Sequence, residues 1–322
     1  MKRRAFLAGV GALALARTAK AQAQGKAKVQ RIGFLRSGPP PPAWINGLRE
    51  GLRELGYVEG RNVTIEFGLA SSADRLPQAA AELVRRNVDV IVASGTQPVA
   101  AARNATATIP IVFVASIDPV ATGFADSLAR PGGNVTGFTG IHADLMGKRL
   151  ELLRDLIPRL SRVAILSYAG NPGNANYVRQ ASLAAASLGL QLRTVSVGDA
   201  AEFERAFDES RDSGAIIQLD DVAFTSHRDR LVELAARHRR PVVYANREFV
   251  DAGGLMAYGP NQSDQYRRAA SYVDRILRGA RPADLPIQQP EKLELVVSLR
   301  TARALEIEIP PEILSRADEV IE

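Results

Sequence analysis

The 322-residue sequence contains no cysteine, one tryptophan and three histidines. Without cysteine the chain cannot form a disulfide, a thiolate nucleophile, a cysteine-ligated zinc site or the acylated N-terminus of a lipoprotein. His142, His227 and His238 are far apart and show no metal-binding spacing, so neither a metal site nor a cofactor is predicted. No G-x-S-x-G element occurs, which removes the usual hydrolase nucleophile, and we expect no enzymatic activity.

Uncompensated positive charge is scarce outside the N-terminus. Five of the 41 Lys and Arg residues lie in the first 23 residues, which contain no acid, and the remaining 36 are balanced by 35 Asp and Glu. A chain that tracks phosphates needs clustered, unpaired Lys and Arg, so nucleic acid is not an expected partner. The apolar fraction of 46% is typical of a globular protein, and the length is sufficient for two domains with separate cores.

Residues 1–23 have the pattern of an export signal. A basic start at 2–4 precedes an apolar stretch at 6–16, and small residues then offer cleavage sites near Ala21 or Ala23. The apolar stretch is too short to span a bilayer, which requires ~20 residues. Arg3-Arg4 and the residues after them resemble the twin-arginine signal, with the general secretory route and an uncleaved anchor as alternatives. We therefore expect export to the periplasm and cleavage.

After residue 28 the chain alternates short apolar runs with longer amphipathic segments. Runs such as 111–114 are apolar at every position, which is typical of parallel strands buried on both faces. Segments such as 44–55 and 76–86 repeat apolar residues every three or four positions, which is typical of helices with one core-facing stripe. Strands are predicted at 31–35, 63–67, 90–93, 111–115 and 135–138, and again at 163–166, 190–197, 215–219, 242–244 and 255–258.

Two such sets of strands predict an α/β protein with two doubly wound, parallel-sheet lobes. We place lobe 1 at residues 29–139 plus about 259–290, and lobe 2 at residues 140–258 plus about 291–322. In this division a late helix at 266–277 returns to lobe 1 before the chain crosses again.

Small polar residues gather where the predicted strands end. In open α/β sheets, ligands bind beyond the carboxyl ends of the strands, where helix N-termini and loop amides converge. Two facing lobes would form a cleft with hydrogen-bonding groups on both walls, which suits a small polar solute. The candidate ligand-binding residues are Ser37, Trp44, Thr96, Ser116 and Asp118 in lobe 1 and Tyr168, Asn171, Asp220, Asn246 and Arg247 in lobe 2.

Several of these candidates have a structural alternative. Ser, Thr, Asp and Asn are also preferred N-caps, and Asp118-Pro119 is a favourable cap pair. Arg247 could bind a carboxylate with its fork or form a helical ion pair with Asp251. Trp44 could stack on a flat ligand or be buried under the first helix.

Asp220 and Asp221 form the one adjacent acid pair at a predicted strand end. Consecutive residues leaving a strand point in opposite directions, so we do not expect the two carboxylates to act together. A hydrogen-bonding contact with a ligand is the role expected for Asp220.

Six motifs lie between residue 109 and the last residue, 322. They are IPIVFV (109–114), DPV (118–120), SLARPGGNVTG (127–137), REFVDAGGLM (247–256), YGPN (258–261) and RADEVIE (316–322). Together they resemble the ABC-transporter substrate-binding protein family related to tryptophan and tyrosine uptake proteins.

The resemblance implies a type I periplasmic-binding-protein fold, with two lobes joined by a multi-segment hinge and a ligand between them. It places Thr96, Ser116 and Asp118 at contacts of the first lobe, with Ser37 placed similarly, and Asn171 and Asp220 at contacts of the second. The prolines at 39–42 depart from the pattern of the amino-acid binders.

The sequence therefore predicts a periplasmic solute-binding component of an ABC importer. It would capture a small carboxylate-bearing or zwitterionic ligand, with aromatic amino acids among the candidates, by hinge closure. Asp118 would bind an ammonium group and Thr96 and Ser116 a carboxylate, with Asp220 and Asn171 closing from the other lobe. The expected partners are this ligand and an ABC permease in the inner membrane, and the chain is expected to be a monomer. The alternative is a periplasmic sensing protein that reports a ligand to a membrane receptor.

Overall fold

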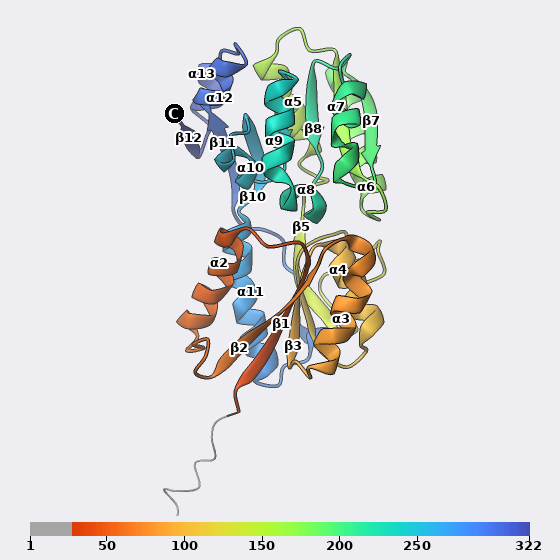
Figure 1. The fold of residues 1–322 in the computed structure, drawn as a ribbon, viewed down its shortest axis with the longest axis vertical. Helices are drawn as coiled ribbons and strands as arrows, with labels where there is room; N and C mark the ends of the chain where they lie inside the picture. The colour runs from red at the N-terminus through yellow and green to blue at the C-terminus, as the bar shows by residue number, and fades with distance from the viewer. Residues whose placement is uncertain (1–27) are drawn as a thin grey trace, which may run out of the picture.

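The computed structural model describes residues 28–322, apart from the side chain of Ile117. The predicted leader at 1–23 lies outside the described residues. Two α/β lobes are stacked along the long axis of the molecule (Figure 1), each built on its own sheet. The fold class predicted from the sequence is thereby confirmed.

The first lobe contains a five-stranded parallel sheet with the order β2-β1-β3-β4-β5. Its strands are β1 (Gln30–Ser37), β2 (Val63–Ala70), β3 (Val90–Ser94), β4 (Ile111–Ile117) and β5 (Val135–Gly140). One face is covered by α2 (Pro42–Glu54) and α11 (Gln262–Leu277), and the other by α3 (Leu76–Arg85) and α4 (Thr96–Ala105). Because both faces are covered, a central strand such as β3 is buried at every position.

The second lobe contains a seven-stranded sheet with the order β12-β11-β10-β9-β8-β6-β7. Its strands are β6 (Arg162–Tyr168), β7 (Gln191–Val197), β8 (Ala215–Gln218), β9 (Val242–Tyr244), β10 (Met256–Pro260), β11 (Leu293–Ser298) and β12 (Glu319–Ile321). One face packs against α5 (Met146–Leu156), α6 (Asn174–Leu188), α12 (Leu299–Ala304) and α13 (Pro311–Leu314). The other packs against α7 (Phe203–Glu209), α8 (Val222–Ser226), α9 (Arg228–Arg237) and α10 (Glu248–Asp251).

Three details differ from the sequence-based expectation. Strands β10 and β11 pair antiparallel, because β10 runs toward the first lobe and β11 runs back out of it. Strand β12 was not predicted, since its three residues are exposed or half-buried and carry little hydrophobic signal. Helix α11 begins at Gln262 rather than Tyr266, where the Asn261 side chain accepts a hydrogen bond from the backbone N–H of Asp264 (2.9 Å).

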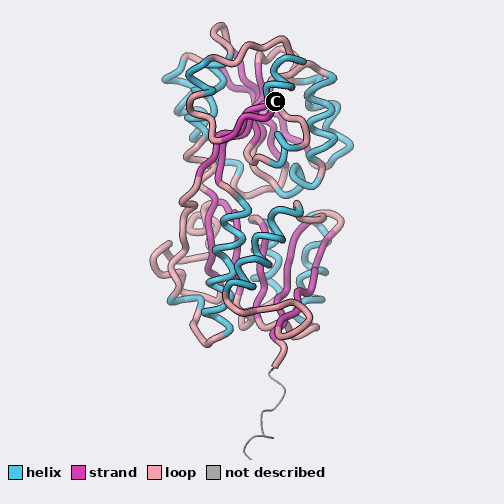
Figure 2. The backbone as a smooth tube through the Cα atoms, turned by 90° about the vertical axis from the view of Figure 1, so that its left-hand side faces the viewer, coloured by secondary structure: helices cyan, strands magenta, loops and turns pink. Residues whose placement is uncertain are grey.

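The chain crosses between the lobes three times, at residues 141–145, at 261 and at 289–292. In Figure 2 these connections lie together on one side of the molecule. Backbone hydrogen bonds join the segments at these crossings to one another. The Asn261 N–H donates to the Lys292 carbonyl (3.0 Å), and the Thr139 N–H donates to the Gln288 carbonyl (2.9 Å). No helix within residues 28–322 is both long enough and apolar enough to cross a membrane.

Candidate functional site

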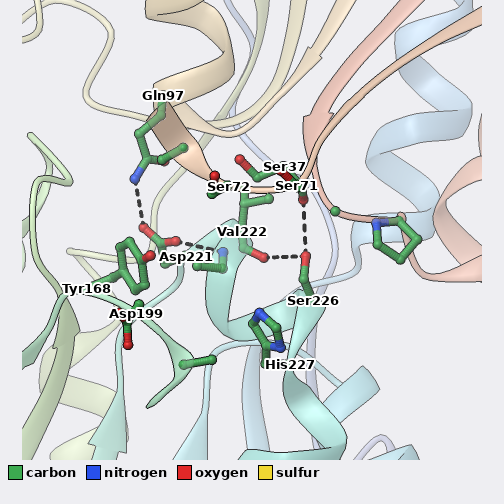
Figure 3. A pocket seen from close by; sticks show the side chains of 15 residues that line it. Ser37, Ser71, Ser72, Gln97, Tyr168, Asp199, Asp221, Val222, Ser226 and His227 are labelled. Atoms are coloured by element: carbon green, nitrogen blue, oxygen red, sulfur yellow. Dashed lines mark hydrogen bonds between the residues drawn. The ribbon is translucent and has the colours of Figure 1, made fainter. Parts of the chain in front are cut away.

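The carboxyl ends of the two sheets face each other and border a hollow of about 410 Å³ (Figure 3). Its walls include Ser37 and Gln97 from the first lobe and Tyr168, Asp221 and Ser226 from the second. Two hydrogen bonds join the walls: Gln97 Nε2 donates to Asp221 Oδ2 (3.2 Å), and Ser226 Oγ donates to the Ser37 carbonyl (3.1 Å). The hollow is therefore made by both lobes together.

Two glycines allow the lobes to approach this closely. Gly38 and Gly95 both have positive φ angles, of 66° and 94°. A Cβ atom would lie 2.5 Å from Ser226 Oγ at Gly38, and 2.4 Å from Val222 Cγ2 at Gly95. Any larger residue there would push helix α8 away from the strand ends of the first lobe.

Arg36, at the carboxyl end of β1, is fully buried. Among the described residues, none of its three guanidinium nitrogens has a hydrogen-bond partner. Burial lowers the pKa of Arg36 to about 10, while three nearby carboxylates and, at high pH, the Tyr266 phenolate act to raise it, so the side chain remains a cation at neutral pH. The carboxylates are those of Asp220, Asp221 and Glu248.

One aromatic ring lies against this arginine, and a second ring stacks on the first. The Arg36 guanidinium carbon lies 5.1 Å from the centre of the Trp44 ring, and Trp44 stacks on Tyr266 with ring centres 5.6 Å apart. Tyr266 donates a hydrogen bond from its hydroxyl to Ser94 Oγ, and Trp44 donates one from Nε1 to Glu248 Oε1 in the second lobe. Trp44 is thus buried, as the alternative expectation held, and it connects the two lobes.

In the second lobe, a chain of buried hydrogen bonds orients Asp220. Arg149 Nη2 lies 3.0 Å from Nδ1 of His142, and because arginine can only donate, the ring hydrogen is on Nε2. That Nε2 lies 3.4 Å from Asp220 Oδ2, while Asn246 Nδ2 donates to Asp220 Oδ1 (2.7 Å). Burial lowers the pKa of His142 to about 4, so a neutral ring separates the Asp220 carboxylate from the charge of Arg149.

Asp221 faces the same region from the start of α8. Its Oδ1 accepts from the backbone N–H of Ala223 (2.8 Å), and its Oδ2 accepts from Asn171 Nδ2 (2.7 Å) as well as from Gln97. Burial raises the pKa of Asp221 to about 6. Within the described residues, Asp220 and Asp221 share no hydrogen-bond partner, since Asp220 contacts Asn246 and His142 while Asp221 contacts Asn171 and Gln97. The expectation that the two carboxylates do not act together stays a prediction.

Three further first-lobe residues bring polar atoms to these strand ends. Ser116 follows a bulge in β4, where Ala115 has a φ of 58°, and its buried Oγ has no partner within the described residues. Thr96 is buried at the start of α4. Gln265, in α11, is 1% exposed, and its side-chain amide also lacks a partner within the described part of the chain. Buried polar atoms without a partner, such as those of Ser116 and Gln265, are costly unless another molecule forms hydrogen bonds with them.

Asp118 does not cap a helix as its alternative held, because residues 119–123 form a turn, and its side chain binds within that turn. Its Oδ1 accepts from the backbone N–H of Ala121 (3.0 Å), and its Oδ2 lies 3.5 Å from Asn176 Nδ2 across the lobes. It lines a second hollow, of about 220 Å³, which shares no lining residue with the larger one. The structure therefore separates Asp118 from Ser37 and Tyr168.

Arg247 lies outside this group of residues. Its guanidinium is 3.4 Å from Asp251, 3.6 Å from Glu294 and 2.9 Å from Glu319, all within the second lobe. The helical ion pair offered as an alternative is present, and two acids from β11 and β12 join it. The neighbouring Glu248 is the residue that turns toward the first lobe.

Sequence reasoning missed Arg36, Gln97, Glu248 and Gln265. A signal for Arg36 exists, since a charged residue that directly follows the run 32–35 at the end of a buried strand requires a buried counterpart or a ligand. The other three depend on contacts between distant segments, which no local pattern specifies. No three His, Asp or Glu side chains within residues 28–322 gather in a way that could hold a metal ion.

Residues 34–321 match the model of the family described as ABC transporter substrate binding protein. The chain belongs to this family. A conserved domain protein from Vibrio cholerae, known from a crystal structure, is 28% identical with a TM-score of 0.86, covering 91% of this chain and 100% of that one. An ABC domain from Streptococcus pneumoniae in complex with L-Trp is 25% identical with a TM-score of 0.84, covering 91% and 99%.

Among curated relatives, a tyrosine-binding protein from Clostridioides difficile is 24% identical over 264 residues, which is 81% of this chain and 76% of the relative. The family expected from the sequence motifs is confirmed, and the structural neighbours are proteins of the type I periplasmic-binding-protein kind.

Proposed function

We propose that this chain is the periplasmic solute receptor of an ABC importer. It encloses a small carboxylate-bearing or zwitterionic ligand between its lobes and presents the closed form to a permease in the inner membrane. In this proposal the leader directs export and is removed near Ala21 or Ala23, the mature protein acts as a monomer, and no covalent chemistry takes place.

One observation carries the proposal: buried polar atoms at the facing strand ends and the adjoining helix have no partner within the described residues. They belong to Arg36, Ser116, Glu248 and Gln265. A small polar molecule held between the lobes can satisfy such atoms and exclude water at the same time. A protein that never bound a ligand there would gain stability by replacing them with apolar side chains.

The contacts between the lobes fit a closed form that can open. Besides the two hydrogen bonds at the hollow, Trp44 donates to Glu248, and Gln262 Nε2 donates to Asn246 Oδ1 (3.2 Å). All of these are contacts between side chains or from a side chain to the backbone, and they would be lost together if the lobes turned apart about their three connections. Ligand binding would then shift the population toward the closed form.

The comparisons direct the choice of first compounds. One relative is named for binding tyrosine and another was solved with L-Trp, so aromatic amino acids are the first probes for this chain. The charges in the region suit a zwitterion, since a free cation and several carboxylates are held apart from one another.

A thermal-shift screen of residues 24–322 tests the proposal. The panel contains the amino acids, small organic acids and aromatic compounds without charge. A compound present at 100 times its dissociation constant should raise the free energy of unfolding by about 2.7 kcal/mol. Trp44 is the one tryptophan of the chain, so for compounds that do not fluoresce themselves its emission reports the same event at the contact between the lobes. If no compound stabilises the protein, and native mass spectrometry finds no molecule bound after gentle purification, the proposal is wrong.

A further inference from the structure

Two arginines within residues 28–322 are fully buried, and they differ in their partners. Arg149 donates from Nε to the Tyr258 carbonyl (2.9 Å) and from Nη2 to His142 Nδ1 (3.0 Å). Arg36 is equally inaccessible to solvent, yet all three of its nitrogens lack a partner within the described residues. A buried guanidinium keeps its charge, so its burial is costly unless an anion reaches it.

The nearby acids do not supply that anion. Their charges act on Arg36, but within the described residues no carboxylate oxygen lies at ion-pair distance from it. Each acid is held by other groups in the second lobe or at the lobe contact. Asp220 accepts from Asn246, Asp221 accepts from Asn171, and Glu248 accepts from Trp44. These hydrogen bonds restrain the acids from collapsing onto the guanidinium.

Contacts within the first lobe also hold the Arg36 side chain in position. Leu35 pairs with Ala93, so the next residues, Arg36 and Ser94, leave adjacent parallel strands on the same face. Tyr266 holds the hydroxyl of Ser94, and Trp44, which stacks on Tyr266, lies against the guanidinium. An arginine that is positioned by ring contacts and left without hydrogen bonds is prepared for a partner from outside the protein.

We propose that Arg36 is the carboxylate-binding residue of this site, and that the ligand it receives is a zwitterion whose ammonium group faces Asp220 and Asp221. This inference rests on the proposed function and names the residue and the ligand class within it. It differs from the expectation that Thr96 and Ser116 bind the carboxylate, with Arg247 as a further candidate, and that Asp118 binds the ammonium group. Arg247 and Asp118 are both engaged elsewhere.

The balance of buried charge favours a zwitterion over an anion of higher charge. The cations of Arg36 and Arg149 are already offset by the buried acids Asp220, Asp221 and Glu248. A ligand with one carboxylate and one ammonium group preserves this balance, whereas a phosphate ester or a dicarboxylate would leave uncompensated negative charge in a buried region. The planar fork of one guanidinium also fits the two oxygens of a carboxylate.

Isothermal titration calorimetry with matched compounds tests the inference. The probes are L-tryptophan, L-tryptophanamide, which lacks the carboxylate, and indole-3-propionate, which lacks the ammonium group. Any amino acid that binds more tightly in the screen is used with its own amide. The wild-type protein should prefer the acid to the amide by at least about tenfold, as expected for a charged hydrogen bond.

Four variants of the full mature chain are compared. Arg36→Gln should weaken binding of the amino acid by about 10- to 100-fold and leave binding of its amide within about threefold, so that the preference disappears. Arg36→Lys keeps the charge but not the fork, and should lie between wild type and Arg36→Gln. Arg247→Gln tests the rival arginine and should keep the wild-type preference. Arg36→Met provides an apolar replacement, and circular dichroism verifies the fold of each variant.

The outcomes separate the inference from the function on which it rests. If the wild-type protein binds an amino acid and Arg36→Gln retains both the affinity and the preference for the acid, Arg36 does not bind the carboxylate, although the receptor function stands. A wild-type protein that binds an acid and its amide equally well also overturns the inference. If the wild-type protein binds no amino acid at all, the ligand class proposed for the receptor is wrong, and the role of Arg36 is overturned with it.

Discussion

Replacing the two buried arginines by leucine should have opposite effects on the ligand-free protein. Arg36→Leu removes a buried cation that no described protein group satisfies, so it should leave the free energy of unfolding unchanged or raise it. Arg149→Leu removes the donor to His142 and to the Tyr258 carbonyl, so it should destabilise the protein. The two residues are matched in type and in burial, which makes each the control for the other.

The expected magnitudes follow from the partners each arginine has. Substituting buried charges by apolar residues of similar size often stabilises a protein by about 1–4 kcal/mol. Two effects reduce that gain: opening of the lobes would hydrate Arg36, and the nearby acids Asp220, Asp221 and Glu248 would lose its charge. We therefore expect between no change and about 2 kcal/mol of stabilisation for Arg36→Leu. Breaking a buried network by removing one member costs about 3–5 kcal/mol, and we expect a loss in this range for Arg149→Leu.

Urea unfolding followed by far-ultraviolet circular dichroism measures both changes, and calorimetry gives the melting temperatures. Each variant is then titrated with the amino acid that binds best to the wild-type protein. Arg36→Leu should combine undiminished stability with loss of binding, which a purely structural arginine cannot do. A loss of more than about 2 kcal/mol in Arg36→Leu would refute the reasoning, because removing only an unsatisfied charge should not have that effect.

Three further predictions concern closure, pH and charge recognition. Ser226→Phe places a ring against Gly38 and should oppose closure by about 1–3 kcal/mol, which weakens ligand binding measured by calorimetry about 5- to 150-fold. Ser226→Ala is the control and should stay within about threefold of the wild-type affinity. Equal affinities in both variants would contradict the closed geometry. Burial raises the pKa of Glu248 from 4.5 to about 7, so between these pH values the folded state holds a proton that the unfolded state has lost, and the free energy of unfolding should fall as pH rises. Glu248→Gln should reduce this pH dependence in urea titrations at pH 5 to 8. An unchanged dependence would show that Glu248 does not titrate in this range. Asp220→Asn should weaken binding of an amino acid about tenfold or more and leave its deaminated analogue within about threefold, and equal losses for both compounds would remove the ammonium contact from the account.

Much of the fold could be predicted because its signals are local. The apolar runs at 111–114 and 242–244 and the helical stripes at 44–55 and 76–86 are visible within short windows, and all became strands or helices. The antiparallel pairing of β10 with β11 is not local, because it depends on the chain returning from the first lobe.

The candidate site was accessible to sequence reasoning only in part. The rule that ligands bind at strand ends led to Ser37, Tyr168 and Asp220, which the structure places at the facing ends of the sheets, and their role in binding stays a prediction. Arg36 was missed because the search at strand ends selected small polar residues, although Arg36 directly follows the predicted strand at 31–35. Arg247 was preferred to Glu248 for its chemistry, but the direction of each side chain depends on contacts with other elements that are distant in sequence.

A crystal structure of the mature protein with the best-binding compound of the screen tests the central claim most directly. The account predicts density between the two lobes, with a carboxylate at hydrogen-bonding distance from the Arg36 guanidinium and an amino group facing Asp220 and Asp221. A compound bound on the outer surface of one lobe, or an Arg36 side chain paired with an acid of the protein, would contradict it.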